Sequence, residues 1–336
     1  MKLGRSYKLS EFLQWTRRKL YVVLLLAALP VILYQALGQK WIAVPWAVAV
    51  LLGTATSFIV GFKNAQTYNR TVEAQQVWTS IASLSRYWGT ICRDFPTNPR
   101  STRLLVLRHV AWLTVLRYQL RSGRVWESAT SRSNMEYRAK FYSVPESEVP
   151  LDEALRKLLP DDEVDPLLAM ENKTIWLIGA QSRALRDLYA HQELAVLHHT
   201  EMQKTLKDLI DQQGRAERLK NFPYPRQYAA INTILVWCFA ALLPFCTVRE
   251  FDKLNDSVAG FLVGQMAWVA IPFSALVSWI YVSLDQVGES TENPFEGGAN
   301  DVPITYISRL LELELREMLG ESRLLPLPEP QNGILL

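Results

Sequence analysis

The sequence predicts an all-α fold: a membrane helical bundle with four transmembrane helices per subunit and a large cytoplasmic helical domain. Two observations predict this class. Four stretches carry no charged residue, at 20–39, 41–62, 227–248 and 257–284, and about 20 helical residues are enough to span a bilayer. A charged, helix-forming stretch of about half the chain separates the first pair from the second. That stretch is too large and too polar to be a loop.

The flanking charges predict the orientation. Residues 1–19 contain six basic residues against the single acidic Glu11, and loops rich in lysine and arginine stay on the cytoplasmic side. Four spans then return the C-terminus to the same side. They place 63–226 in the cytoplasm and the short link 249–256 outside. We therefore expect a multi-pass protein with both termini cytoplasmic.

These signals divide the chain into six parts. The first nineteen residues mix Phe12 and Trp15 with Arg17, a pattern typical of a helix that lies at the membrane interface. The parts are an interfacial N-terminal helix at 1–19, transmembrane helices 1 and 2 at 20–62, a cytoplasmic helical region at 63–226, transmembrane helices 3 and 4 at 227–284, a C-terminal loop and helix at 285–320, and an extended tail at 321–336.

Helical periodicity runs through the charged middle of the chain. Apolar residues recur at helical spacing from 64 to 93, and Pro96 ends that helix. A second long helix is expected from about residue 165 through Arg218, since no proline interrupts its interior. Helices of that length usually continue a bundle beyond the membrane.

Composition excludes several classes of function. The net charge is only +3 and no basic patch is interleaved with aromatic residues, so nucleic acid is not an expected partner. The three cysteines, Cys92, Cys238 and Cys246, lack metal-ligand spacing and are expected to be buried thiols. The sequence has no phosphate-binding glycine loop, nucleophile elbow or HExxH motif. We therefore expect that the protein is not an enzyme, and its sequence shows no evident metal site.

The second uncharged stretch carries the most informative pattern. Thr54, Phe58 and Phe62 are spaced four residues apart and share one face of a helix. One interpretation is packing within a monomeric bundle, helped by the small residues Ser57 and Gly61. The other is a pore lining, in which aromatic rings form a hydrophobic constriction that gates by dewetting. The residues alone leave both open.

Four landmarks resemble the bestrophin family. Residues 61–74, GFKNAQTYNRTVEA, resemble the G-F-R-N-N-x-x-Y-x-R-W-W-E-A of bacterial members, and 57–62 resemble the segment that forms the family's neck. The segment 221–225, NFPYP, resembles the proline-rich start of the third span. The segment 292–304 resembles the acidic loop near the C-terminus. Their order matches over roughly residues 5–320.

The resemblance implies a homopentamer around a central pore in the lipid bilayer, for a bacterial-type member in the inner (plasma) membrane. It implies a channel for monovalent ions, with chloride favoured because most members pass anions. A cation-selective (sodium) homologue is the alternative, since at least some bacterial members conduct cations. The implied pore neck is Thr54, Phe58 and Phe62. Thr54 departs from the family's usual isoleucine and would make its ring wider or wetter.

The resemblance also implies two further sites. A cytoplasmic aperture is expected on the long helix before the third span, at Met202, Leu206 and Leu209, with Leu206 favoured. Animal members bind calcium in the acidic loop, where this chain offers Glu292, Glu296, Asn300 and Asp301. Calcium needs six to eight oxygen ligands, and this loop offers fewer acidic residues than the acidic run of animal members. Calcium is nevertheless the one cofactor that the resemblance implies. The alternative is a loop that caps the C-terminal helix.

Two rival functions differ in class. A membrane enzyme would need a convergent set of titratable residues, and the sequence shows none. A non-conducting scaffold or receptor would signal through the middle region. Ion flux through purified protein in liposomes separates both from a channel.

Overall fold

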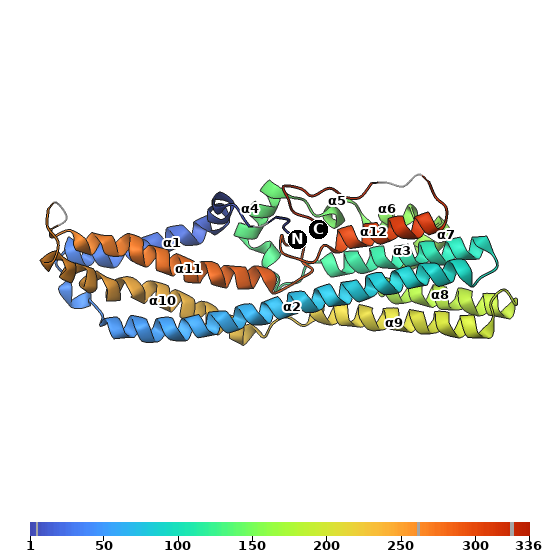
Figure 1. Cartoon of the computed structure of the whole chain (residues 1–336), viewed down its shortest axis with the longest axis horizontal. Coiled ribbons are helices and arrows are strands. Elements are labelled where there is room, and N and C mark those ends of the chain that lie inside the picture. Colours follow the sequence, from blue (N-terminus) through green and yellow to red (C-terminus); the bar gives the residue numbers. More distant parts are fainter. Residues whose placement is uncertain (5, 261–262, 323–325) are drawn as a thin grey trace.

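The structure is a computed structural model that describes residues 1–4, 6–260, 263–322 and 326–336. The molecule is elongated (Figure 1), and its two halves differ in composition. One half, called here the membrane half, holds long apolar helices. The other, called here the polar half, is a bundle of charged helices. Apart from isolated bridges, the secondary structure of the described residues is helical.

The membrane half contains four helices that are long and apolar enough to cross a bilayer. They are α1 (Leu9–Gln35), the first part of α2 (Trp46–Asp94), α10 (Arg226–Lys253) and α11 (Ala270–Thr291). Short 3₁₀ helices lie in their connections: η1 (Lys40–Ile42), η3 (Leu254–Asp256) and η4 (Met266–Val269). Small side chains such as Ala27 and Ala240 are buried where these helices meet, as is usual where membrane helices pack closely.

Two predicted boundaries in this half differ from the structure. The helix α1 runs without a break from Leu9, because no glycine or proline interrupts 9–29. The predicted interfacial helix at 1–19 and the first span are therefore not separate helices. The last span starts later than the uncharged run 257–284 and extends beyond it, to Thr291. Gly260 and Gly264 take positive φ in the preceding connection. Residues 261–262 of that run lie outside the described residues.

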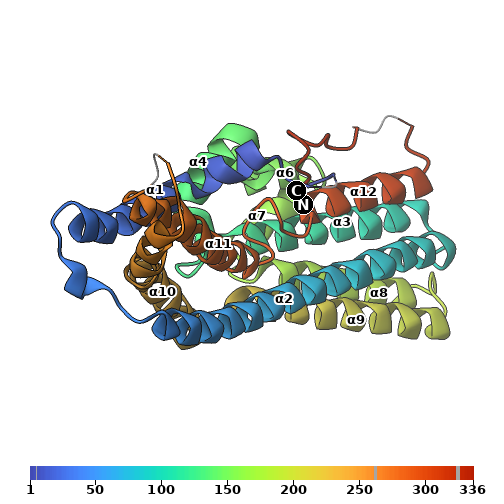
Figure 2. The same cartoon turned by 60° about the vertical axis from the view of Figure 1, so that its left-hand side comes forward.

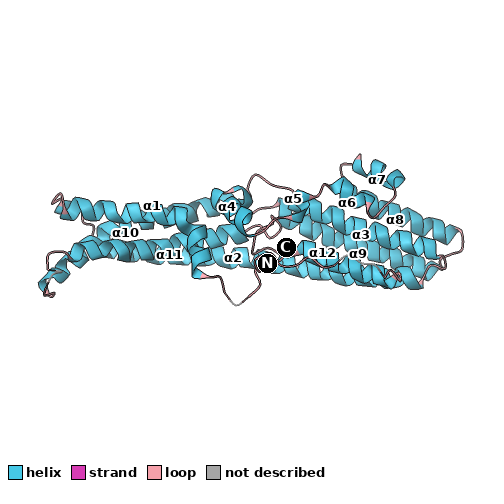
Figure 3. Ribbon diagram, turned by 90° about the horizontal axis from the view of Figure 1, so that it is seen from above, coloured by secondary structure: helices cyan, strands magenta, loops and turns pink. Residues whose placement is uncertain are grey.

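In the polar half, four further long helices form a bundle with the second part of α2 (Figures 2 and 3). These are α3 (Pro99–Arg121), α8 (Lys173–Ala190), α9 (Val196–Asn221) and α12 (Ile304–Met318), and α8 reaches α2 only through α3 and α9. Shorter pieces complete this half: η2 (Ser128–Thr130), α4 (Arg132–Phe141), α5 (Pro145–Glu148), α6 (Leu151–Arg156) and α7 (Asp161–Leu168). Trp78, Trp88 and Trp112 are fully buried in the core.

The predicted long helix over 165–218 is wrong. The structure replaces it with the end of α7, then α8 and α9, which pack against each other. Asn172 caps α8 by accepting a hydrogen bond from the Ile175 amide, and Gln192 takes a left-handed φ of 61° in the turn before α9. The burial of the apolar faces of α8 and α9 against each other outweighs the local propensity to continue as one helix.

The tail at 321–336 was expected to be extended, and its described parts, 321–322 and 326–336, contain no helix. It pairs with the N-terminus: the Leu3 amide donates to Gly333 O (2.6 Å) and the Leu335 amide to Met1 O (2.8 Å). Residues 323–325 of the predicted tail lie outside the described residues.

Helix α2 joins the two halves as one element of 49 residues, and Gly89 sets its distance from α12. A Cβ at Gly89 would lie 2.3 Å from Leu315 Cδ2 and 3.2 Å from Met318 Sδ. Leu315 is fully buried and has little room to move. We expect Gly89→Ala to destabilise the protein by about 1–3 kcal/mol, as measured by thermal unfolding in detergent. Gly61→Ala is the matched control, because a Cβ there meets nothing within 4 Å.

Candidate functional site

One face of α2 remains open along the membrane half. Thr54 is exposed, and Phe58 and Phe62 are 77% and 52% exposed, so the three predicted neck residues do share an outward face. The Thr54 hydroxyl donates to Val50 O at 2.8 Å within the same helix. Because that bond occupies the hydroxyl, Thr54 presents a less polar surface than its side chain alone suggests.

The opposite face of α2 is fixed to α10 and α11. A Cβ at Gly53 would lie 3.0 Å from the ring of Phe239 on α10, so α2 and α10 are in close contact at this level. Further along, Lys63 forms a buried ion pair with Asp285 at 2.7 Å. These contacts fix the rotation of α2 and therefore the direction in which its open face points.

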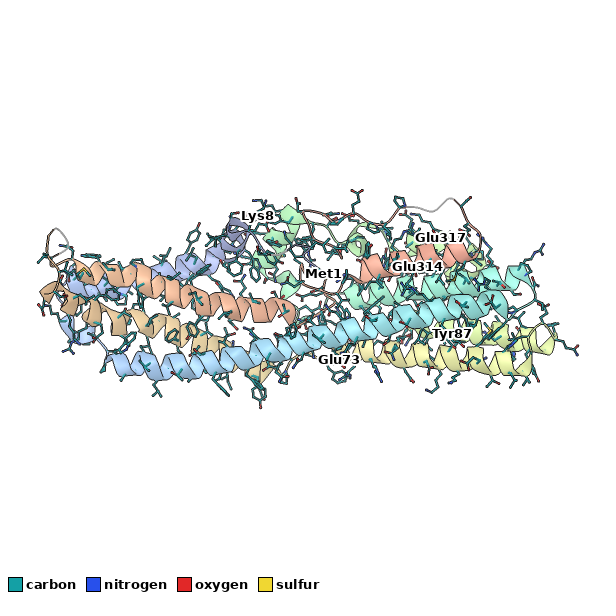
Figure 4. The ribbon with its side chains drawn as sticks, viewed as in Figure 1. Met1, Lys8, Glu73, Tyr87, Glu314 and Glu317 are labelled. Atoms are coloured by element: carbon teal, nitrogen blue, oxygen red, sulfur yellow. The ribbon has the colours of Figure 1, made fainter. Side chains whose placement is uncertain are left out.

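The open face continues beyond the membrane half without a charged residue. Every exposed residue of α2 from Trp46 to Ser83 is uncharged. The three charged residues in that range are placed elsewhere: Lys63 is buried, and Arg70 and Glu73 are half-buried. Figure 4 shows Glu73 at the edge of α2 that faces α9, where it pairs with Arg218. At 1.5 Å per residue the uncharged face is roughly 55 Å long.

The predicted aperture residues do not line any outer surface. Met202, Leu206 and Leu209 are 0%, 2% and 0% exposed and belong to the core of the polar half. Their i, i+4, i+7 spacing is that of a core-facing stripe, so this prediction is wrong. The most exposed large apolar residues of α9 lie instead at its N-terminus, where Val196 is 57% and Leu197 is 78% exposed, against 37% for Ile210 in its middle.

The sequence reasoning also missed a basic face on α9. Four of the five exposed charged residues of this helix are basic: Lys204, Lys207, Arg215 and Arg218, with Asp211 the acidic one. They recur at spacings of three and four residues, opposite the buried stripe. That spacing was the available signal.

The residues predicted to bind calcium do not fit a calcium site, because protein donors already hold them. The partners are Arg226 for Glu292 (2.6 Å), Ser128 and Ala129 for Glu296, Tyr7 for Asn300 (2.8 Å), and Arg121 with the Gly297 and Gly298 amides for Asp301. Within the described ranges, no group of three or more His, Cys, Asp or Glu side chains converges. The loop thus closes on itself instead of presenting six to eight oxygens.

Burial changes the protonation of this loop. It raises the pKa of Glu296 to about 8, and nearby Asp301 and Glu127 add to the rise. Burial likewise raises the pKa of Asp301, against the opposing effect of the Arg121 guanidinium. The folded protein therefore holds a proton on Glu296 at a pH where the unfolded chain has released it.

This shift predicts a pH-dependent stability. A raised pKa in the folded state contributes stability that is complete below about pH 4.5 and is lost as the pH rises through about 8. Between pH 5 and pH 8 we expect the wild type to lose up to a few kcal/mol of unfolding free energy that Glu296→Gln does not lose. The unfolding temperature of the wild type should therefore fall relative to that of the variant over this range. Parallel curves for the two proteins would contradict this assignment.

Comparisons with known proteins agree with this architecture. A family model described as "Bacterial/Fungal Bestrophin protein" matches residues 9–317. The chain is 27% identical to the "Voltage-dependent anion channel-forming protein YneE" of Salmonella typhimurium strain LT2, over 86% of this chain and 80% of that protein. It is 24% identical to the protein of the same name from Escherichia coli K12, over 87% and 81%. A crystal structure of a bacterial bestrophin homolog from Klebsiella pneumoniae superposes with a TM-score of 0.74 at 26% identity, covering 91% of this chain and 99% of that chain.

Proposed function

Because the chain belongs to the bacterial and fungal bestrophin family, we propose that it forms a homopentameric channel that passes monovalent ions, with chloride favoured, through a central pore. It is a multi-pass membrane protein of a channel family and not an enzyme. The relatives named above are called anion channel-forming proteins, which supports the same function here.

The uncharged face of α2 carries this proposal. Lipid can cover exposed apolar residues in the membrane half, but it cannot cover the same face in the polar half. There the exposed residues Tyr68, Gln76 and Thr79 continue the face without a charge. Charged residues are depleted at the centre of protein interfaces, so a surface of that length without charges favours an interface. Five copies of α2 around an axis would cover its flanks and turn the central stripe inward.

In that arrangement Thr54, Phe58 and Phe62 form three successive rings of the neck. Apolar rings in a narrow pore resist wetting and so gate ion flow. The neck lies at the end of the membrane half nearer the polar half, since Phe62 is adjacent to the buried Lys63. Ions would reach it through the space that the five polar halves enclose.

The basic face of α9 supports anion passage. Fixed positive charge along a conduction path raises the local concentration of anions. Lys204 and Arg215 belong to this face, and α9 packs against the polar half of α2. The proposed pore would therefore attract chloride before the neck and exclude sodium.

The reversal potential in a planar bilayer under a sodium chloride gradient tests this proposal. We expect it to lie toward the chloride equilibrium potential, and Lys204→Gln with Arg215→Gln to move it toward zero. A value toward the sodium potential would establish a cation channel instead. An absence of current with either ion, or a monomeric mass in detergent, would reject the pentameric channel itself.

A further inference from the structure

A cavity of about 230 Å³ lies where the membrane half meets the polar half, away from the open face of α2. Its walls come from the N-terminal segment, the start of α1, α4, the end of α11 and the loop that follows α11. Figure 1 shows α4 beside the first turns of α1 at this junction. Five aromatic side chains line it: Tyr7, Phe12, Trp15, Tyr137 and Tyr142.

Two hydrogen-bond donors of α4 lack partners in this cavity. The Tyr137 hydroxyl is buried without a partner among the described residues, and the whole residue is only 9% exposed. The Arg138 Nε is likewise buried and unpaired within the described part of the chain. A buried donor without an acceptor loses its hydrogen bonds to water and gains none in exchange, so a ligand that supplies an acceptor is favoured. The neighbouring polar groups are paired, since Tyr7 donates to Asn300 at 2.8 Å and Tyr142 to Gly297 O at 3.0 Å.

The charges around the cavity favour an anion. Glu11 is neutralised by Lys2 at 3.0 Å, and Glu296 accepts hydrogen bonds from Ser128 and Ala129. No carboxylate of the described residues lies within ion-pair distance of Arg138, whose Nη2 donates to the carbonyls of Glu296 and Gly297. The guanidinium is therefore the uncompensated charge of this cavity. Its Nε cannot accept a hydrogen bond, so an ammonium ligand would leave it unpaired.

We propose that this cavity binds a small carboxylate with a single aromatic ring or an apolar body of similar size. The ring packs against Phe12 and Trp15, where edge and face contacts between aromatic groups are favourable. The carboxylate accepts hydrogen bonds from Tyr137 and Arg138. The volume is adequate, since a cavity of about 150 Å³ holds benzene. Binding at this site does not depend on the proposed channel function.

Calorimetric titration of the detergent-purified protein tests the chemistry with three probes of one size. We expect phenylacetate to bind, 2-phenylethanol to bind about tenfold or more weakly, and 2-phenylethylamine not to bind, because hydrogen bonds to a charged group are the stronger ones. Equal or tighter binding of the amine would overturn the assignment, as would a failure of phenylacetate to bind at millimolar concentration.

Variants locate the site. Tyr137→Phe keeps the aromatic wall and removes the unpaired hydroxyl, so we expect phenylacetate to bind about tenfold more weakly. Ala129→Leu fills the cavity and should abolish binding. Tyr87→Phe is the matched control, because that tyrosine is exposed and distant from the cavity (Figure 4). Unchanged binding in both Tyr137→Phe and Ala129→Leu would overturn the proposal.

The same carboxylate chemistry can arrive from water or from the bilayer. We expect phenylacetate binding in lipid nanodiscs to persist when oleate is added if the natural ligand is a soluble acid. Displacement of phenylacetate by oleate, both in the wild type and in Tyr87→Phe, would identify a fatty acid as the source. Either result supports a carboxylate site at this cavity.

Discussion

Replacement of both Phe58 and Phe62 by alanine is expected to raise ion flux through liposome-reconstituted protein by about tenfold or more. Each phenylalanine is the most exposed large apolar residue at its level of α2, and neither belongs to a hydrophobic cluster of the described residues. In a pentamer the double substitution removes ten rings from the neck. A wider, less apolar constriction stays wet, and a barrier lowered by about 1.4 kcal/mol already gives a tenfold rate.

The matched control is Phe273→Ala on α11. Phe273 is also exposed in the membrane half, at 42%, but it packs against Phe251 and not on the face of α2. We expect its flux to remain at the wild-type level. Flux that is unchanged in the double variant, or raised equally in both proteins, would remove Phe58 and Phe62 from the gate. Measurement by chloride efflux from loaded liposomes makes the comparison direct.

The second large effect is expected at the buried ion pair that fixes α2. Lys63 and Asp285 are each 4% exposed at the side chain. Asp285 also accepts hydrogen bonds from Asn232 (2.6 Å) and Thr233 (3.3 Å). Asp285→Ala leaves the Lys63 ammonium buried and unpaired. We expect a loss of about 3–5 kcal/mol, seen as a large drop in the unfolding temperature in detergent.

A paired substitution separates the charge from the packing. Lys63→Met with Asp285→Leu removes both charges and keeps apolar volume, and such replacements are often neutral. We therefore expect this double variant to be more stable than Asp285→Ala alone. If the double variant is the less stable of the two, then shape and not charge compensation determines stability at this position.

The sequence predicted the features that periodicity and charge determine. Four uncharged runs located the membrane helices, and the stripe at Thr54, Phe58 and Phe62 was correctly placed on one outward face. Its role as a neck stays a prediction. The turn at Gln192 could not be predicted, because a left-handed residue other than glycine leaves little local signal.

The two failed site predictions have a common cause. An apolar stripe such as Leu206 and Leu209 can face a pore or a core, and spacing does not say which. A short acidic segment can bind a metal or accept hydrogen bonds from its own loop. Asp301 does the second, through two glycine amides and Arg121. The three-dimensional packing decides both cases, and a partner such as Arg121 lies 180 residues from Asp301 in the sequence.

The pairing of Lys63 with Asp285 also has a consequence for biosynthesis. The two residues are 222 positions apart in the chain. At about 5–20 residues per second, a ribosome needs roughly 10–45 s to reach the second after the first. During that interval the newly inserted α1 and α2 hold an ammonium group at the membrane without its counter-ion. Water or lipid phosphate must serve as a temporary partner, so the first two helices can dock fully only after α11 has been translated.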